Sequence, residues 1–331
     1  VQVRLGKPLR DTVGNDNGGN VPTGARLGSQ MNGPGNDAAA NPDFNFLNGD
    51  DGNLNYKRGD ITSLALKGTH EFGLKTTDGW RALARATWVG DFKADDTRRT
   101  ELSSEAKKIA VHNFTMLDAW VSKDFKVFDN RNATLRVGNQ VMSWGEDIFI
   151  IGGINSINAF DLRKLHTPGT LVKEILRPAP MASLNMGLTD TLSAEAYYQW
   201  QWNAFRFDPV GTFFSGADVV GAGQRNAYIP SSVLGEAPGT FGDIGAGIQE
   251  GINVVPFEAD RKPPKGKQFG LSMRFKPKGA DTEYALYFER YHDKLPFTTL
   301  FTDPALSTRN VANIGYYNEY GKDKNLFGAS F

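Results

Sequence analysis

Hydrophobic and polar residues alternate along several segments of the chain, most clearly over residues 192–203. This segment reads Leu-Ser-Ala-Glu-Ala-Tyr-Tyr-Gln-Trp-Gln-Trp-Asn, with apolar side chains at the even-numbered positions. Successive side chains of a β-strand point to opposite faces, so this period of two predicts a strand with one apolar face. The strand would be about twice the usual length of five or six residues. Its apolar face ends in three aromatic residues, as strands that cross an outer membrane do: Tyr198, Trp200 and Trp202.

The same alternation predicts strands elsewhere in the chain. Trp80 and Trp88 share the apolar face of one of them, and in a strand tilted by about 45° they would stand roughly 19 Å apart in height. That height is close to the apolar band of about 25 Å, bordered by aromatic girdles, of outer-membrane barrels. The further segments in which we expect strands are 1–5, 61–75, 80–92, 114–127, 133–141, 182–188, 269–275, 284–292, 311–320 and 326–331.

The connections between these strands alternate in length. Short ones are expected at 76–79, 128–132, 189–191, 277–281 and 321–325, and long ones at 93–113, 142–181, 204–267 and 293–310. Barrels of the outer membrane have this asymmetry, with short periplasmic turns and long outer loops. We therefore expect an all-β fold, a transmembrane antiparallel up-and-down β-barrel, over residues 1–331. Bacterial single-chain barrels have even strand numbers, so about eleven segments suggest part of a larger barrel, truncated at both ends.

The two faces of the expected strands assign residues to the lumen and to the membrane. Polar faces with charges of both signs suit a wet lumen, although each residue alone is compatible with simple solvation. The residues expected to line the lumen are Arg81, Arg85, Arg136, Gln140, Glu195, Gln199, Arg274 and Glu283. The aromatic residues expected to face the membrane are Trp80, Trp88, Tyr198, Trp200 and Trp202.

Three long segments interrupt the pattern. Residues 14–55 form a polar loop rich in Gly, Asn and Asp, which is either plainly solvated or able to hold calcium. Residues 204–267 form a Gly- and Pro-rich outer loop. Residues 145–180 are too apolar for an exposed loop, so in a soluble protein they would be core and in a barrel they would fold inward. The side chains expected to gate the lumen or contact a ligand there are Ile148, Phe149, Ile150, Ile151, Ile154 and Ile157.

Composition excludes several classes of function. Basic and acidic residues number 37 each, so no surplus of positive charge favours nucleic acid. There is no cysteine and hence no disulfide or thiolate metal site. The four histidines, His70, His112, His166 and His292, stand in no catalytic or metal-binding spacing. We therefore expect neither an enzyme, nor a metal site, nor a cofactor.

Several motifs resemble a known family. They are Val-Met-Ser-Trp-Gly-Glu at 141–146, Gly-Ile-Asn-Ser-Ile-Asn at 153–158, Pro-Gly at 168–169, Lys-Glu at 173–174, Pro-Ala-Pro at 178–180 and Asp-Pro-Val-Gly-Thr at 208–212. Asp-Gly-Asn-Leu-Asn-Tyr at 51–56 and Arg-Gly-Asp at 58–60 are similar too. The chain thus resembles the Gram-negative outer-membrane proteins called Domain of Unknown Function 1302. Such proteins are often encoded beside a lipoprotein and an inner-membrane exporter, which implies traffic of lipids or hydrophobic compounds.

These observations favour a conduit in the bacterial outer membrane for hydrophobic or lipid-like molecules. The expected partners are outer-membrane lipid, a hydrophobic small molecule and a periplasmic lipoprotein. One alternative is a structural or adhesive protein with a plugged lumen, and another is a general polar porin.

Overall fold

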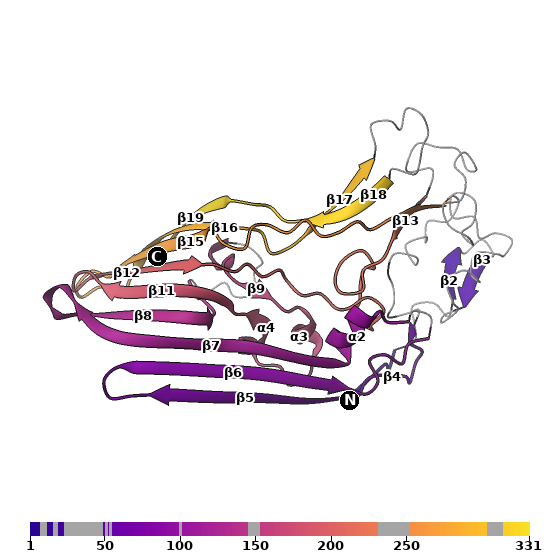
Figure 1. The fold of residues 1–331 in the computed structure, drawn as a ribbon, viewed down its shortest axis with the longest axis horizontal. Coiled ribbons are helices and arrows are strands. Elements are labelled where there is room, and N and C mark those ends of the chain that lie inside the picture. Colours follow the sequence, from indigo (N-terminus) through magenta and orange to yellow (C-terminus); the bar gives the residue numbers. More distant parts are fainter. Residues whose placement is uncertain are drawn as a thin grey trace.

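The computed structural model describes residues 1–6, 12–15, 19–22, 49, 52, 55–98, 101–144, 153–230, 252–302 and 314–331. Its main element is a nine-stranded antiparallel sheet, strongly curved, with other segments folded behind it in the view of Figure 1. The strands are, in spatial order, β5 (Ala65–Lys75), β6 (Trp80–Asp91), β7 (His112–Val127), β8 (Arg131–Gln140), β11 (Ala179–Gly187), β12 (Leu192–Gln199), β15 (Gln268–Phe275), β16 (Tyr284–Tyr291) and β19 (Lys324–Ser330).

Smaller elements occupy the connections. Antiparallel pairs form between β1 (Gln2–Val3) and β4 (Ile61–Ser63), β2 (Thr12–Asn15) and β3 (Gly19–Pro22), β9 (Ala159–Phe160) and β10 (Leu176–Arg177), β13 (Ala227–Pro230) and β14 (Ile252–Val255), and β17 (Phe297–Thr302) and β18 (Ile314–Glu319). The helices are α2 (Ser104–Ala110), α3 (Arg163–His166) and α4 (Val172–Ile175), with 3₁₀ turns η2 (Phe128–Asn130) and η3 (Gly153–Asn155). None of the described helices is long and apolar enough to span a membrane.

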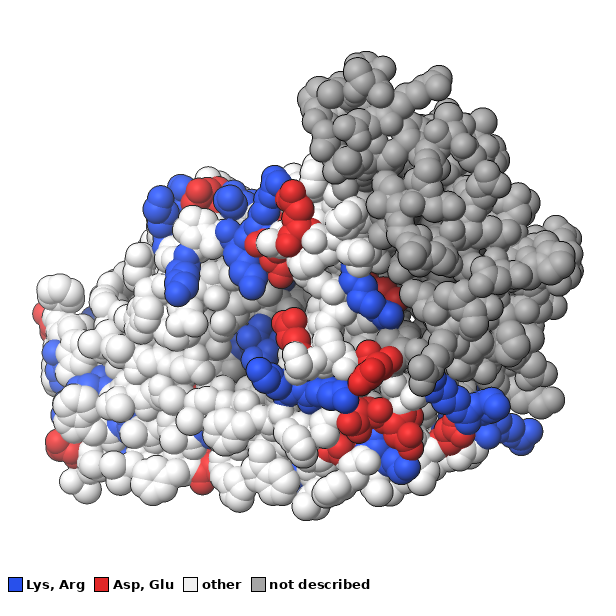
Figure 2. All heavy atoms as spheres, turned by 45° about the vertical axis from the view of Figure 1, so that its right-hand side comes forward, with Lys and Arg blue, Asp and Glu red and all other residues white. Residues whose placement is uncertain are grey.

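The predicted alternation of faces is confirmed in the sheet. Neighbouring strands pair apolar residue with apolar residue, as where Val137 of β8 stands opposite Ala182 of β11. The apolar set forms the outward face, where large side chains such as Phe72, Leu271 and Leu286 are exposed. On this face of the nine described strands, the Lys, Arg, Asp and Glu residues are Lys123, Arg131 and Arg290, which lie near strand ends. Figure 2 shows the result as a largely uncharged band between charged groups at the two ends of the strands.

The predicted rhythm of connections holds up to β16, but the short turn predicted at 321–325 leads into β19 at the end of the sheet with the long links. Short links, within 76–79, 128–130, 188–191 and 276–283, lie at one end of the sheet, and the long ones lie at the other (Figure 1). Two expected wall strands are wrong. Residues 314–319 pair with β17 in a separate hairpin, so that β19 is the neighbour of β16, and Gln2–Val3 pair with β4. The sheet therefore has nine strands rather than about eleven, and the described residues leave it open, with β5 and β19 at its edges.

The long link between β8 and β11 folds across the inward face, and we call residues 153–178 of this link the plug. A hydrophobic core joins the plug to the sheet, made of Met142, Trp144, Ile157, Ala179, Met181, Tyr197, Ala285 and Tyr287, with Ile154 packed against it. Gly270 makes room for this core, because a Cβ there would lie 2.9 Å from the Trp144 ring and 2.6 Å from the Tyr197 ring. The indole N–H of Trp144 donates to Glu195 at 2.8 Å, which satisfies the polar end of the buried ring.

The plug reaches both edges of the sheet. At one end, η3 contacts β19, and the Cδ1 atom of Ile154 lies 3.1 Å from where a Cβ of Gly328 would stand. At the other end, Glu174 of α4 binds Lys67 and Thr69 of β5. The plug thus crosses the inward face from one edge strand to the other.

Candidate functional site

Charged groups fasten α4 to the edge strand β5. The Glu174 side chain is 2% exposed, forms an ion pair with Lys67 and accepts a hydrogen bond from Thr69 Oγ1 at 2.7 Å. Lys67 also donates to the Gly169 carbonyl and the Thr170 hydroxyl. Burial opposes the charged form of Glu174, but the hydrogen bonds from Lys67 and Thr69 hold the pKa of its carboxyl below the usual value. A second pair, Lys173 with Glu71 at 3.1 Å, is half exposed on both sides and is the weaker attachment.

A second cluster of charges centres on Asp161, whose carboxylate is 2% exposed. Arg163 donates to both of its oxygens, from Nε at 2.7 Å and from a terminal nitrogen at 2.5 Å. Arg206 adds a contact at 3.7 Å. Nearby Arg177 donates to the Ala204 carbonyl, and burial lowers its pKa to about 9. Since the three guanidinium groups of Arg163, Arg177 and Arg206 outnumber the Asp161 carboxylate, this cluster carries net positive charge.

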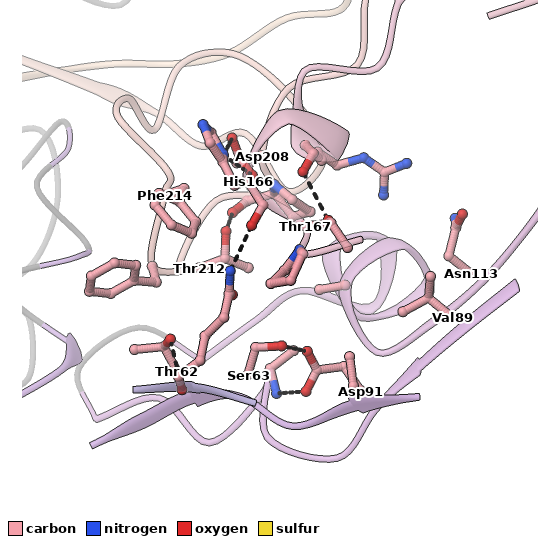
Figure 3. Close-up of a pocket in the computed structure, with 18 of the residues that line it drawn as sticks. Thr62, Ser63, Val89, Asp91, Asn113, His166, Thr167, Asp208, Thr212 and Phe214 are labelled. Carbon is pink, nitrogen blue, oxygen red and sulfur yellow. Dashed lines mark hydrogen bonds and ion pairs between the residues drawn. The ribbon is translucent and has the colours of Figure 1, made fainter. Parts of the chain in front are cut away.

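A cavity of about 290 Å³ lies between the plug and the ends of β4 and β6. In Figure 3, Thr62, Ser63 and Asp91 border it on the sheet side, and His166, Asp208 and Phe214 border it opposite. Much of the remaining lining is apolar, including Tyr56, Ala65, Val89, Ala94, Ile109, Ala110, Pro168, Pro209 and Phe213. The cavity therefore combines an apolar wall with a few polar groups, as small-molecule sites do.

His166 and Asp208 meet at this cavity although they stand far apart in the sequence. The His166 Nδ1 atom lies 3.2 Å from an Asp208 oxygen, and the imidazole stacks on Phe214 with 4.1 Å between ring centroids. Burial raises the pKa of Asp208, while His166 acts in the opposite direction. The Thr212 hydroxyl donates to the Pro209 carbonyl, so it is engaged elsewhere and does not complete a nucleophile–histidine–carboxylate triad.

Lys164 of α3 also lines the cavity. The residue is 4% exposed, and its ammonium nitrogen has no hydrogen-bond partner within the described part of the chain. Burial lowers the pKa of this amine; Asp161 and Glu174 act to raise it, and Lys67 and Arg163 act to lower it. A buried cation without a partner is costly in a folded protein, and because this nitrogen has almost no accessible surface, other atoms of Lys164 form its part of the cavity wall.

Most residues predicted to line the lumen lie on the inward face. Arg85 bridges Glu71 and Asp118, each at 2.7 Å, and Arg81 pairs with Asp124. The other inward residues are Arg136, whose guanidinium stands 4.4 Å from the Trp120 ring centroid, Gln140, Glu195, Gln199 and Arg274. Glu283 precedes β16 in a short connection, where its exposed carboxylate lies 3.8 Å from Arg274, and its place in the lumen stays a prediction.

Of the aromatic residues predicted to face the membrane, Trp80, Trp88 and Tyr198 lie on the outward face. The strand that was expected to continue to residue 203 ends at Gln199, so Trp200 and Trp202 lie beyond it. Trp200 is 41% exposed, whereas Trp202 packs edge-on against Tyr320 with 4.7 Å between centroids. The indole N–H of Trp202 donates to the Asp293 carbonyl at 3.1 Å, which turns this ring toward the protein.

The structure describes two of the six residues that were expected to form the gate. Ile148, Phe149, Ile150 and Ile151 lie outside the described residues. Ile157 is 1% exposed within the hydrophobic core, and Ile154 packs against the same core. Ile157 therefore anchors the plug to the sheet and has no surface left for a ligand, whereas the role of Ile154, which is partly buried, as a gate or ligand contact stays a prediction.

Comparison with known proteins decides the family. The family described as "Protein of unknown function (DUF1302)" matches residues 1–331, the whole chain. The chain belongs to the DUF1302 family. No curated protein matches this DUF1302 chain. A crystal structure of the siderophore receptor PirA from Pseudomonas aeruginosa matches with 9% identity and a TM-score of 0.27, over 81% of this chain and 38% of the receptor. The chain thus spans well under half of that receptor.

Sequence reasoning did not find the cavity, since its polar residues come from separate segments. Lys164, His166 and Asp208 become neighbours only when the plug and the following connection fold onto the sheet. One signal was present, because the family motifs Lys173-Glu174 and Asp208 to Thr212 contribute to the α4 attachment and to the cavity lining.

Proposed function

We propose that this DUF1302 protein is an outer-membrane β-barrel protein that conducts hydrophobic or lipid-like molecules past its plug. The observation that carries the membrane assignment is the outward face, where exposed apolar side chains form a band without charges between the strand ends. A contiguous exposed apolar surface of this kind needs lipid or another apolar partner. The inward face, with its ion pairs among Arg85, Glu71 and Asp118, is suited to the interior of a barrel.

This proposal requires the two sheet edges to be paired in the membrane. In hydrocarbon no water satisfies the backbone groups of an edge strand, and each unsatisfied group costs several kcal/mol. The outer backbone groups of β5 and β19 must therefore find partner strands when the protein spans a bilayer.

The choice of hydrophobic cargo rests on the plug and the cavity. Over β11, β12 and β16 the inward face packs against Trp144 and Ile157 instead of lining an aqueous channel, which disfavours a general polar porin. The cavity beside α3, at the end with long connections, has a largely apolar lining. A structural or adhesive role remains the second candidate, favoured by the ion pairs that fasten the plug to β5.

The membrane assignment is tested with single cysteines, since the chain has none. Leu184 faces outward and its neighbour Asn185 faces inward near the short connections. We expect a bimane label on Leu184→Cys, in reconstituted protein, to be quenched by a lipid-attached nitroxide and spared by iodide, with the reverse for Asn185→Cys. Equal quenching of both labels by iodide would remove the basis for the membrane assignment.

The conduit is tested by uptake into intact Gram-negative cells that express the full chain. We expect faster and saturable uptake of the hydrophobic fluorophore N-phenylnaphthylamine, without faster uptake of a small polar sugar. Uptake of both would indicate a polar porin, and uptake of neither would leave the structural role. The Lys67 Nζ atom lies 3.4 Å from the Thr170 hydroxyl, so a bismaleimide linker that bridges Lys67→Cys and Thr170→Cys replaces the length of the lysine side chain, fixes the plug to β5 and should suppress the hydrophobic uptake.

A further inference from the structure

The outward face of the sheet carries a shallow groove along β6. Three consecutive outward positions of this strand are alanines, and they form the floor of the groove: Ala82, Ala84 and Ala86. Larger side chains of the neighbouring strands stand opposite these alanines and form the walls, namely Leu74, Phe72 and His70 of β5 and Val121 and Met116 of β7. The floor is about 13 Å long at 3.3 Å per residue. The groove is therefore an apolar trough on the face that we assign to lipid.

The part of the groove next to β5 is a hollow of about 260 Å³. Its lining consists of the outward-facing residues His70, Phe72, Ala84, Ala86 and Met116, together with Glu71 and Arg85. Phe72 is 67% exposed and Met116 is 49% exposed, so both side chains stand up beside the alanine floor. A chain of methylene groups that lies in this hollow would contact side chains on both sides.

His70 adds a polar ring to one wall of the groove. This residue is exposed and lies at the middle of β5, and the indole N–H of Trp88 donates to its Nε2 atom at 3.1 Å. Gly68 permits the bond, because a Cβ there would lie 2.5 Å from the Trp88 Nε1 atom. An indole can only donate, so Nε2 accepts and the neutral imidazole carries its proton on Nδ1. The bond from Trp88 therefore makes His70 a hydrogen-bond donor within the apolar band.

The depth of His70 indicates which acceptor it meets. A donor on a lipid-facing surface needs an acceptor, and hydrocarbon supplies none. Trp88 marks the level of the aromatic girdle, where headgroups meet acyl chains. His70 stands opposite Ala86, two residues along β6 from Trp88, which places it roughly 5 Å deeper in a strand tilted by about 45°. The acceptors nearest to this depth are the carbonyl groups that join acyl chains to the backbone of a lipid.

We propose that the groove binds one acyl chain of a diacyl phospholipid, whose ester carbonyl accepts a hydrogen bond from His70 Nδ1. The connection after β6, beyond the Trp88 end of the groove, favours a zwitterionic headgroup. Lys93 there pairs with Asp96 at 2.7 Å. Lys107 lies 3.9 Å from Asp95. Such neutral pairs match a headgroup that carries both charges, whereas a polyanionic glycolipid would need free cations.

This inference rests on the membrane assignment in the proposed function, because the groove lies on the outward face. Native mass spectrometry of the purified full chain in detergent measures the affinity of the first bound lipid. The two probes are dioleoyl phosphatidylethanolamine and its dioleyl ether analogue, which has the same headgroup but no ester carbonyl. We expect the ester lipid to bind about 2- to 10-fold more tightly, as one hydrogen bond to a carbonyl implies. This comparison is made on the wild type and needs no variant.

Variants assign the preference to the groove. His70→Leu should remove the preference for the ester, and His70→Gln, which keeps an N–H donor, should retain part of it. His112→Leu is the matched control, because His112 also faces outward but lies at the end of β7, opposite Gly90, and this variant should keep the full preference. Ala84→Phe fills the hollow and should weaken both lipids alike. Ala196→Phe, at an outward alanine of β12, should leave both affinities unchanged.

Three results would count against the proposal. Equal affinity of the wild type for the ester and ether lipids, or an ester preference that survives in His70→Leu, would overturn the site. Tighter binding of lipid A than of the phospholipid would overturn the choice of a zwitterionic lipid. If lipid-attached nitroxide quenches the label on Leu184→Cys but the ester preference is absent, the membrane assignment stands and only this inference falls.

Discussion

The attachment of α4 to β5 offers a sharp test of what holds the plug in place. Glu174→Gln keeps the shape of the side chain and the acceptor for Thr69 Oγ1, but removes the charge that pairs with Lys67. Breaking a fully buried ion pair by removing one partner costs about 3–5 kcal/mol. The Lys67 side chain is 16% exposed and retains the Gly169 carbonyl and the Thr170 hydroxyl as neutral acceptors, so we expect the lower end, about 3 kcal/mol.

This cost should appear as local release of the plug. At 1.4 kcal/mol per factor of ten, 3 kcal/mol shifts the equilibrium between docked and released plug by about 100-fold. Hydrogen exchange measured by mass spectrometry on peptides covering residues 159–178 reports that equilibrium directly. We expect protection in this segment to fall by about 100-fold in Glu174→Gln, while the peptides of β11 and β12 keep theirs.

Two further variants test whether the lost protection in Glu174→Gln comes from breaking a buried ion pair. Lys173→Gln removes the neighbouring pair with Glu71, in which both side chains are 44% exposed, so its effect should remain under about 1 kcal/mol. The double variant Lys67→Met with Glu174→Met removes both charges and should recover much of the protection, because apolar replacement of a buried pair is often neutral. If Glu174→Gln and Lys173→Gln lose protection equally, burial does not decide the strength of the attachment and the reasoning is wrong.

Two other predictions concern packing and pH. Gly270→Ala places a methyl group against the Trp144 and Tyr197 rings and 2.8 Å from the Phe288 carbonyl, and overpacking of this kind should lower the free energy of unfolding in urea by about 1–3 kcal/mol. Lys164→Met should raise the thermal midpoint at neutral pH. The folded pKa of Lys164 is lowered, so the unfolded chain binds more protons and the wild type gains stability as pH rises toward the ordinary value of 10.5. The advantage of the variant should therefore shrink with rising pH, and an advantage that grows instead would contradict the direction of the shift.

The parts of the fold that follow from local pattern were predictable from the sequence. The period of two assigned inward and outward faces correctly for Arg85, Glu195 and Tyr198, because neighbouring strands share the same alternation. The lengths of the connections between strands were also predictable, because each connection begins where the alternation of apolar and polar residues stops. A period of two identifies a strand but not its partner, which is why residues 314–319 were placed in the wall although they pair with β17.

The candidate site was beyond such reasoning, because it depends on how irregular segments cross the sheet. Nothing near Lys164 in the sequence indicates that Asp161 is taken by Arg163 and Arg206, or that Glu174 is taken by a residue of β5. The apolar character of the plug was recognised, but its purpose was not. Ile157 reads equally well as a gate or as an anchor until its contact with Trp144 is known.

The plug spans the concave side of the curved sheet from one edge strand to the other. Because η3 contacts β19 and α4 is bound to β5, the plug links the two edge strands of the open sheet to each other. Loss of the bonds between α4 and β5 would leave this link attached to the sheet only through the hydrophobic core and β19. The cavity at α3 lies close to the end of the plug that is bound to β5. An occupant there would also act on the connections after β6 and after β12, because Arg163 donates to the Ile109 carbonyl and the Arg206 backbone N–H donates to the Phe160 carbonyl.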